Sequence, residues 1–196
     1  MFVTGVVLAA GNSVRFGLGE AKQLLPYRGR TLLDAGLDLA RACAFDQRLV
    51  TLGGSAAAVR ARADLTGFDT VDVPAAGTGC GASVSTAVRS VDPRADGLVL
   101  LLGDQPGVRV ATVTALLTAG GPLRVSRYAD SLGHPFWFGR EMFGALGELH
   151  GDKAVWKLLH SGTHPVTEVE VAGPVPIDVD TREDYERLLA GDHLVR

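Results

Sequence analysis

Two cationic side chains stand out near the start of the sequence because they follow an apolar run. In the stretch LAAGNSVRFGLGEAKQLLPYRGRTLLD, Arg15 and Lys22 fall between the first predicted strand and the first predicted helix. A connection of a few residues would suffice if the chain only had to reverse direction, so this connection is long for that task. Small residues at its start let backbone N–H groups approach an anion, and two cations can hold a polyphosphate from different sides. The spacing predicts a phosphate-binding loop, and ordinary solvated surface cations are the alternative.

Carboxylates form the second group of candidates. Asp104 comes just after the apolar run GLVLLL in the stretch LLLGDQP, which places it at the end of a buried strand. A carboxylate there can hold Mg²⁺, which prefers carboxylate and phosphate oxygens; a turn-forming aspartate is the alternative, since Gly, Asp and Pro all favour turns. Near the other end of the chain, IDVDTREDY contains Asp178 and Asp180 directly before a capping box of Thr181 and Asp184. Asp180 is a candidate second metal ligand, and the spacing fits equally well an acid that favours a helix N-terminus.

Two common nucleotide-binding motifs are missing from the sequence. A dinucleotide fingerprint needs GxGxxG directly after the first strand and an acid about twenty residues further on. The first strand here ends in a turn with a single glycine, Gly11, and the second predicted strand ends in Leu52, Gly53 and Gly54 without an acid. The P-loop pattern GxxxxGK[ST] does not occur either. These absences argue against a nicotinamide-dependent enzyme and against a P-loop protein.

Alternating strand-like and helix-like segments predict how these residues are positioned. Apolar runs indicate strands at residues 3–8, 48–52, 70–73, 97–102, 123–127 and 166–171, with helical patterns between them. Thr31 and Asp34 form a capping box at one helix start, and Asp152 is expected to cap another helix. This alternation is typical of a three-layer α/β/α Rossmann-like fold with a mostly parallel sheet, here a single domain of residues 1–196. Ligands of such sheets bind beyond the carboxyl ends of the strands, where the cationic loop and Asp104 would lie.

Composition limits the class of partner. The 196 residues include 19 Lys and Arg and 22 Asp and Glu, for a formal net charge of −3. No global field therefore favours nucleic acid or an anionic membrane surface, and no apolar stretch approaches membrane-spanning length. Cys43 and Cys80 form no CxxC pair and no metal-like spacing, and the first residues lack the basic region of a signal peptide. We expect a reduced, cytoplasmic compartment.

The order of the motifs resembles that of the MobA-like nucleotidyltransferases, and most closely that of the molybdenum cofactor cytidylyltransferases. The resemblance rests on LAAGNSVRFG…K, LLPYRGRTLLD, GCGASVSTAV, LLGDQP, GHPFWFGREMF, GDKAVWKLL and DVDTREDY, which span nearly the whole chain. It implies a glycosyltransferase-A-like fold and transfer of a nucleotidyl group from an NTP, with pyrophosphate leaving. Two positions depart from the family pattern: Phe16 stands where Met is frequent, and Gln105 stands where GDMP or a similar tetrapeptide is usual.

The resemblance also implies roles for individual residues. Nucleotide binding falls on Ala9, Ala10, Gly11, Arg15, Lys22, Gly81 and Ser83. Metal binding falls on Asp104 and Asp180, and Arg15, Lys22 and Asp104 would act in catalysis itself. The motif GHP is similar to the acceptor-side loop of the family and points to His134, for which hydrogen bonding in a turn beside aromatic side chains is the alternative.

The sequence thus predicts a Mg²⁺-dependent nucleotidyltransferase that moves an NMP group from an NTP to a phosphorylated small-molecule acceptor such as the molybdopterin cofactor. CMP, and hence CTP, is favoured because LAAG resembles the cytidylyl-transferring members, whereas guanylyl-transferring members tend to read LAGG. Three alternatives stay open: transfer to a sugar phosphate or another phosphorylated metabolite, a NAD(P)H-dependent reductase, and a non-catalytic nucleotide- or cofactor-binding protein. Neither nucleic acid nor a membrane is expected as a partner.

Overall fold

The sheet is built around two strands that are apolar along nearly their whole length. In the computed structural model, which describes residues 1–11, 21–74 and 79–192, β1 (Val3–Ala9) and β6 (Gly97–Leu102) are almost entirely buried. Continuous burial of this kind is typical of strands that helices cover on both faces. The two strands pair in parallel, so their carboxyl ends lie at the same edge of the sheet.

Among the described residues, seven strands form the main sheet, in the order β5-β4-β1-β6-β8-β7-β9. The other five are β4 (Gln47–Leu52), β5 (Asp69–Asp72), β7 (Leu123–Arg127), β8 (Leu132–Gly139) and β9 (Val166–Glu170). β1 pairs in parallel with β4 and β6, as do β4 with β5 and β7 with β9, whereas β8 runs antiparallel to both β6 and β7. The mostly parallel sheet is as predicted, with one reversed strand that the alternation of segments did not reveal.

The reversed strand has a local cause. Residues 128–131 are all that joins β7 to β8. A connection this short makes a hairpin, because a parallel crossover needs about a dozen residues or more. The register pairs Leu100 of β6 with Phe136 of β8, so β8 begins beside the carboxyl end of β6. His134 is thereby placed at the same edge of the sheet as Asp104.

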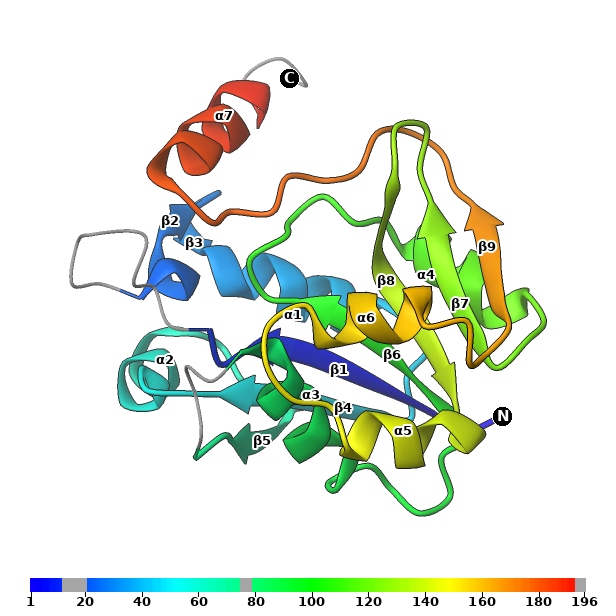
Figure 1. Ribbon diagram of the computed structural model, residues 1–196. Coiled ribbons are helices and arrows are strands. Elements are labelled where there is room, and N and C mark those ends of the chain that lie inside the picture. Colours follow the sequence, from blue (N-terminus) through cyan, green and yellow to red (C-terminus); the bar gives the residue numbers. More distant parts are fainter. Residues whose placement is uncertain (12–20, 75–78, 193–196) are drawn as a thin grey trace.

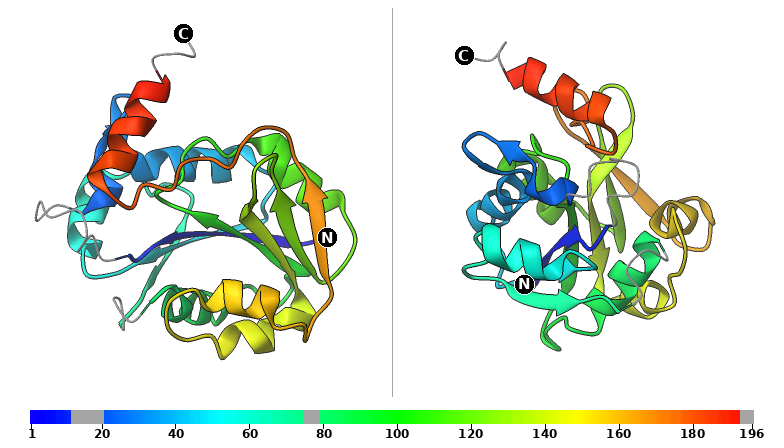
Figure 2. Two further views of the ribbon diagram at one scale, coloured as in Figure 1. Left: turned by 45° about the horizontal axis from the view of Figure 1, so that its top comes forward. Right: turned by 90° about the vertical axis from the view of Figure 1, so that its left-hand side faces the viewer.

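Helices cover both faces of the sheet (Figures 1 and 2). One face carries α1 (Leu32–Ala42), α2 (Ala56–Arg62) and α4 (Val110–Thr118), and the other carries α3 (Cys80–Val88), α5 (Phe143–Gly147) and α6 (Ala154–His160). Successive strand side chains point to opposite faces, so Val7 packs with the first group of helices and Val6 with the second. The three-layer α/β/α arrangement is confirmed.

A third, smaller core joins the end of the chain to the region after β1. The short helix η2 (Lys22–Leu24) is followed by a small hairpin of β2 (Pro26–Tyr27) and β3 (Arg30–Thr31), and α7 (Arg182–Asp192) packs nearby. Figure 1 shows the segment that runs from β9 across to α7. Val179 of this segment lies in the same core and is fully buried. Within the described ranges, no helix combines the length and apolar character needed to cross a membrane.

Both predicted capping boxes are present. At the start of α1, Thr31 and Asp34 each bond to the other's backbone N–H. Thr181 and Asp184 make the same pair of contacts before α7. These contacts satisfy N–H groups that a helix start would otherwise leave without a partner.

The prediction for the start of α6 was wrong. The cap position is occupied by Lys153, not Asp152, and the backbone of Lys153 is left-handed, with a φ of 56°. Gly151 also has a positive φ, of 75°. The chain therefore enters α6 through a tight turn, and Asp152 lies one residue before the cap position.

Candidate functional site

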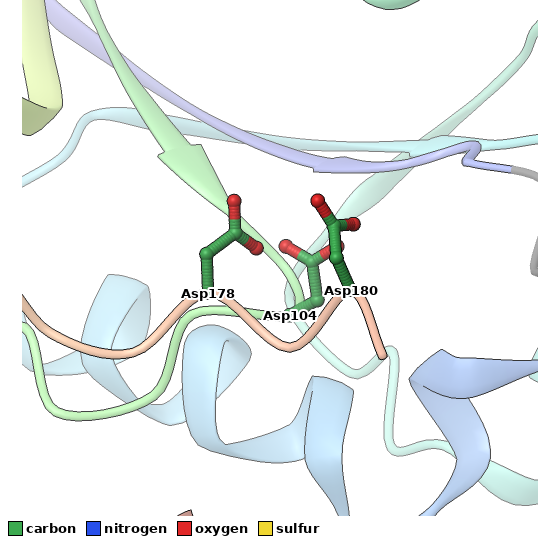
Figure 3. A group of neighbouring side chains, drawn as sticks. All are labelled: Asp104, Asp178 and Asp180. Atoms are coloured by element: carbon green, nitrogen blue, oxygen red, sulfur yellow. The ribbon is translucent and has the colours of Figure 1, made fainter. Parts of the chain in front are cut away.

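Three carboxylates from distant parts of the sequence converge near the carboxyl end of β6 (Figure 3). Asp104 lies just beyond β6, and Asp178 and Asp180 lie on the segment between β9 and α7. One carboxylate oxygen of each residue lies within 4.8 Å of the others. The structure brings Asp104 and Asp180 together, and it adds Asp178, for which the sequence predicted no metal role.

Backbone contacts hold the two segments side by side. The N–H of Val179 donates to the carbonyl oxygen of Asp104 at 3.0 Å. The side-chain amide of Gln105 donates to the carbonyl oxygen of Pro176 at 3.1 Å, so the residue that departs from the family pattern links the two segments. Val179 points into the core, and the aspartates on either side of it project together away from that core (Figure 3). The spacing Asp-Val-Asp is therefore the sequence signal that identifies Asp178.

Lys22 lies between two of these carboxylates. It is the first residue of η2, and its Nζ lies 2.5 Å from Oδ2 of Asp104 and 2.7 Å from Oδ1 of Asp180. Its side chain is 10% exposed. Burial lowers the pKa of Lys22, but the charges and hydrogen bonds of the two aspartates outweigh burial and raise the pKa above its ordinary value. Lys22 is therefore a cation that bridges Asp104 and Asp180.

The three carboxylates carry more negative charge than Lys22 offsets. Partial burial and the charges of Asp104 and Asp180 raise the pKa of Asp178 to about 7, while Lys22 acts in the opposite direction. The carboxylate of Asp178 is thus crowded by the like charges of Asp104 and Asp180. Carboxylate oxygens are the ligands that Mg²⁺ and other hard divalent cations prefer. The donor set fits a divalent metal, with these three aspartates as the residues that could hold it.

The small-residue segment Ala9–Gly11, at the end of β1, is held from two sides. Ala9 and Ala10 are buried and Gly11 is exposed. The side-chain amide of Gln23 donates to the carbonyl oxygens of Ala9 and Gly11, and Oγ1 of Thr51 accepts from the N–H of Ala9. Small residues in a fixed turn can present backbone groups to an anion. Arg15 lies outside the described residues, so its phosphate contact stays a prediction.

Gly81 and Ser83, predicted to contact the nucleotide base and ribose, lie near the start of α3. Gly81 is buried, and its N–H donates to the carbonyl oxygen of Gly151 at 3.1 Å. A Cβ atom at Gly81 would lie 2.8 Å from the backbone of His150, so the close approach of these two segments requires glycine. Ser83 is also buried. Packing accounts for Gly81, and the nucleotide contacts of both residues stay predictions.

His134 is half-buried near the start of β8. Its ring lies 4.0 Å from that of Phe136, centroid to centroid, and its carbonyl oxygen accepts a hydrogen bond from Oη of Tyr128 at 2.7 Å. Burial lowers the pKa of His134 to about 3, so the imidazole is neutral near pH 7. A neutral imidazole can donate and accept hydrogen bonds but supplies no positive charge. The acceptor role of His134 stays a prediction, with packing beside aromatic rings as the alternative.

A mostly parallel sheet with carboxylates gathered beyond its strand ends defines a site of the kind used for ligand binding in α/β proteins. Residues 5–166 match the MobA-like NTP transferase domain. The chain belongs to this family, as its motifs predicted. The family assignment and the fold agree on a nucleotidyltransferase-type protein.

Several relatives span nearly the whole chain. Nicotine blue oxidoreductase of Paenarthrobacter nicotinovorans is 34% identical, over 95% of this chain and 96% of that protein. Purine catabolism protein PucB of Bacillus subtilis is 32% identical, over 94% of this chain and 95% of that protein. The crystal structure of Rv0371c from Mycobacterium tuberculosis H37Rv is similar with a TM-score of 0.90 and 56% identity, over 97% of this chain and 98% of that chain. A complex of Rv0371c with manganese matches with a TM-score of 0.87 and 54% identity, over 97% and 99% of the two chains.

Proposed function

We propose that this protein is a Mg²⁺-dependent nucleotidyltransferase that transfers CMP from CTP to a phosphorylated small-molecule acceptor such as the molybdopterin cofactor, with release of pyrophosphate. The observation that carries the proposal is the group of Lys22, Asp104, Asp178 and Asp180 at the carboxyl end of β6. This group combines the ligands that a divalent cation prefers with a cation that can bind phosphate. Membership of the MobA-like family supports the same class of reaction.

Asp104, Asp178 and Asp180 are the residues that would hold the metal. Bound Mg²⁺ would neutralise and orient the phosphates of the NTP, as metals do in related transfer reactions. The crowding of like charges around Asp178 supports this assignment, because a divalent cation relieves it. The manganese complex of Rv0371c, which is 54% identical, also supports a divalent metal.

Lys22 would change partners when substrate binds. In the structure its ammonium group is bonded to Asp104 and Asp180, which are needed for the metal. The triphosphate offers this ammonium group new oxygen partners, which are negatively charged like the carboxylates they replace. Together with Arg15, Lys22 would then stabilise the charge that accumulates on the β- and γ-phosphates as pyrophosphate leaves.

The chemical step requires little covalent chemistry from the protein. An oxygen of the acceptor's phosphate monoester attacks the α-phosphorus of CTP, the bond from that phosphorus to the bridging oxygen breaks, and pyrophosphate leaves with the electron pair. The attacking oxygen is already ionised, so no general base is needed, and positioning with charge neutralisation carries the reaction. His134, whose pKa is about 3, is a weak base, and we assign it to holding the acceptor by hydrogen bonding.

A panel of nucleotides tests the proposal. Thermal unfolding is measured with each NTP and Mg²⁺, and pyrophosphate release is then measured with a molybdopterin-type acceptor. We expect CTP to raise Tm more than the other NTPs do, and we expect pyrophosphate release to depend on the acceptor. Sugar phosphates and other phosphorylated metabolites in place of the acceptor test the first alternative. If none of the NTPs binds, the proposal is wrong.

A NAD(P)H-dependent reductase is the second candidate, because one relative with 34% identity is named nicotine blue oxidoreductase. The missing GxGxxG fingerprint argues against this candidate. Titration with NADH and NADPH separates the two: tight binding would favour the reductase, and its absence would exclude it. A non-catalytic protein would bind an NTP but release no pyrophosphate with any acceptor in the panel.

A further inference from the structure

We infer that Gln23 is a positioning residue for NTP binding, which orients the backbone of the small-residue segment Ala9–Gly11 at the end of β1. This inference deepens the proposed function and rests on it. Gln23 follows Lys22 in η2 and is 2% exposed. Its Nε2 donates to the carbonyl oxygens of Ala9 and Gly11, at 3.1 and 3.0 Å. One buried side chain therefore fixes both ends of this segment.

The neighbours of this amide determine which way it faces. Carbonyl oxygens can only accept hydrogen bonds, so the NH₂ group of Gln23 must point toward Ala9 and Gly11. In a trans peptide the carbonyl and the following N–H point in opposite directions. When Gln23 holds the carbonyl oxygen of Ala9, it therefore turns the N–H of Ala10 away from itself. Gln23 thus sets the direction of the backbone dipoles in a segment whose small side chains would let an anion approach.

A second buried side chain fixes the same residue through its N–H. Thr51 of β4 is fully buried, and its Oγ1 accepts from the N–H of Ala9 at 3.1 Å. Ala9 is the last residue of β1. Where the strand ends, side chains from η2 and β4 hold the backbone on its carbonyl side and on its N–H side. The backbone of Ala9 is therefore held on both sides in the absence of a nucleotide.

The other end of the Gln23 amide argues against a role in stability alone. Across the part of the chain that the structure describes, its buried Oε1 has no hydrogen-bond partner. A buried acceptor without a partner lowers stability, and an apolar side chain of similar size would avoid this cost. What Gln23 provides and an apolar side chain cannot is the pair of hydrogen bonds to Ala9 and Gly11.

Gln23→Met tests the inference because it nearly keeps the size of the side chain and removes the donor. We expect kcat/KM for the NTP to fall about tenfold, which corresponds to the loss of one or two hydrogen bonds that orient a binding site. The KM for the acceptor should not change, since the proposed function places the acceptor beside His134 and not beside Ala9–Gly11. Calorimetric titration with CTP and Mg²⁺ should show the same loss as an increase in Kd.

Thr4→Val is the matched control. Thr4 is fully buried near the opposite end of β1, and its Oγ1 donates to Oε1 of Gln47 at 2.9 Å. We expect only Gln23→Met to weaken NTP binding, and the Tm of each variant, measured alongside, shows how far its stability has changed. Thr51→Val removes the second contact to Ala9 and should weaken NTP binding in the same direction by a smaller factor, which keeps the test decisive if Gln23→Met does not fold.

The outcomes separate this inference from the proposed function. NTP affinities of Gln23→Met and Thr51→Val equal to that of Thr4→Val would overturn the role of Gln23 while leaving the nucleotidyltransferase intact. If the unmodified protein binds no NTP, the proposed function itself is wrong.

Discussion

The ammonium nitrogen of Lys22 lies 2.5 Å from Oδ2 of Asp104, in a salt bridge that joins the region after β1 to the end of β6. Asp180 shares the same nitrogen at 2.7 Å. Lys22 and a divalent cation would therefore compete for the same oxygens, because both are held there by opposite charge. A nucleotide that offers its phosphates to Lys22 would relieve this competition. Metal and NTP should accordingly strengthen each other's binding.

Lys22→Met separates the two roles of this lysine. We expect tighter binding of Mn²⁺ in the absence of nucleotide, because the competing cation is gone. We also expect kcat/KM for the NTP to fall about ten- to a hundredfold, since a charge-assisted contact contributes roughly 1.5–3 kcal/mol. Calorimetry with Mn²⁺ measures the first effect and pyrophosphate release the second.

Lys157→Met is the control for this change, because Lys157 is an exposed lysine of α6. It should alter neither the metal affinity nor the turnover. Mn²⁺ affinity that is unchanged in Lys22→Met would rule out the competition, and normal turnover would show that Lys22 does not contact the NTP.

Asp104→Asn and Asp180→Asn test the metal assignment. The fold should survive Asp104→Asn, because the bond from Val179 is to the backbone carbonyl of residue 104 and not to its side chain. Turnover should fall by about a hundredfold or more, as expected when a metal ligand is lost. The effect of Asp180→Asn should be smaller, since its side chain is 47% exposed and that of Asp104 only 16%. Asp69→Asn is the control, because Asp69 is exposed at the start of β5. If Asp104→Asn releases pyrophosphate at the rate of the unmodified protein, the metal assignment is wrong.

Asp178→Asn should change how stability depends on pH. The pKa of Asp178 is raised from 3.8 to about 7 in the folded protein, so the folded state loses stability from this group as the pH rises through that range. Without divalent metal, Asp178→Asn should therefore raise Tm at pH 8, by about 1–3 °C for a partly exposed group in a chain of this size. At pH 4 the difference should nearly vanish. Thermal unfolding in a chelator at both pH values measures this, and an equal shift at both would contradict the like-charge crowding.

Much of the fold and part of the site could be predicted because their signals are local. The apolar run before Asp104 indicates a buried strand, and strands of parallel sheets deliver their following residues to one edge. The reversed direction of β8 was not predicted, although its cause is also local: the connection of residues 128–131 is too short for a crossover. Length of connection, and not only the alternation of segments, decides strand direction.

Other parts of the site depend on contacts between distant residues. The bridge from Lys22 to Asp104 and Asp180 joins residues that lie far apart in the sequence, so no local sequence pattern could predict it. Asp178 was within reach of a local signal, because residues two apart in an extended segment share one side. It was missed because its neighbour Asp180 alone matched the family pattern. Gln23 carries no chemistry of its own, and only its contacts with Ala9 and Gly11 reveal it.

His134→Gln should make the folded protein more resistant to acid. The pKa of His134 is lowered from 6.5 to about 3 by burial, so protonation favours the unfolded chain. The stability that the neutral ring provides is present above pH 6.5 and is lost as the pH falls toward 3. The free energy of unfolding should decline less steeply over this range in His134→Gln than in the unmodified protein. Urea titrations at several pH values measure the slope, and parallel slopes would show that His134 titrates normally.

His134→Ala tests the assignment to the acceptor side. His134 lies near the start of β8, beside the carboxyl end of β6, and its ring contacts Phe136. If the imidazole holds the acceptor by a hydrogen bond, kcat/KM for the acceptor should fall about tenfold, while the Kd of CTP with Mg²⁺ stays unchanged. If His134 serves only in packing, Tm should fall and the surviving folded protein should turn over normally. A large increase in the Kd of CTP would instead move His134 to the nucleotide side, and the acceptor assignment would be wrong.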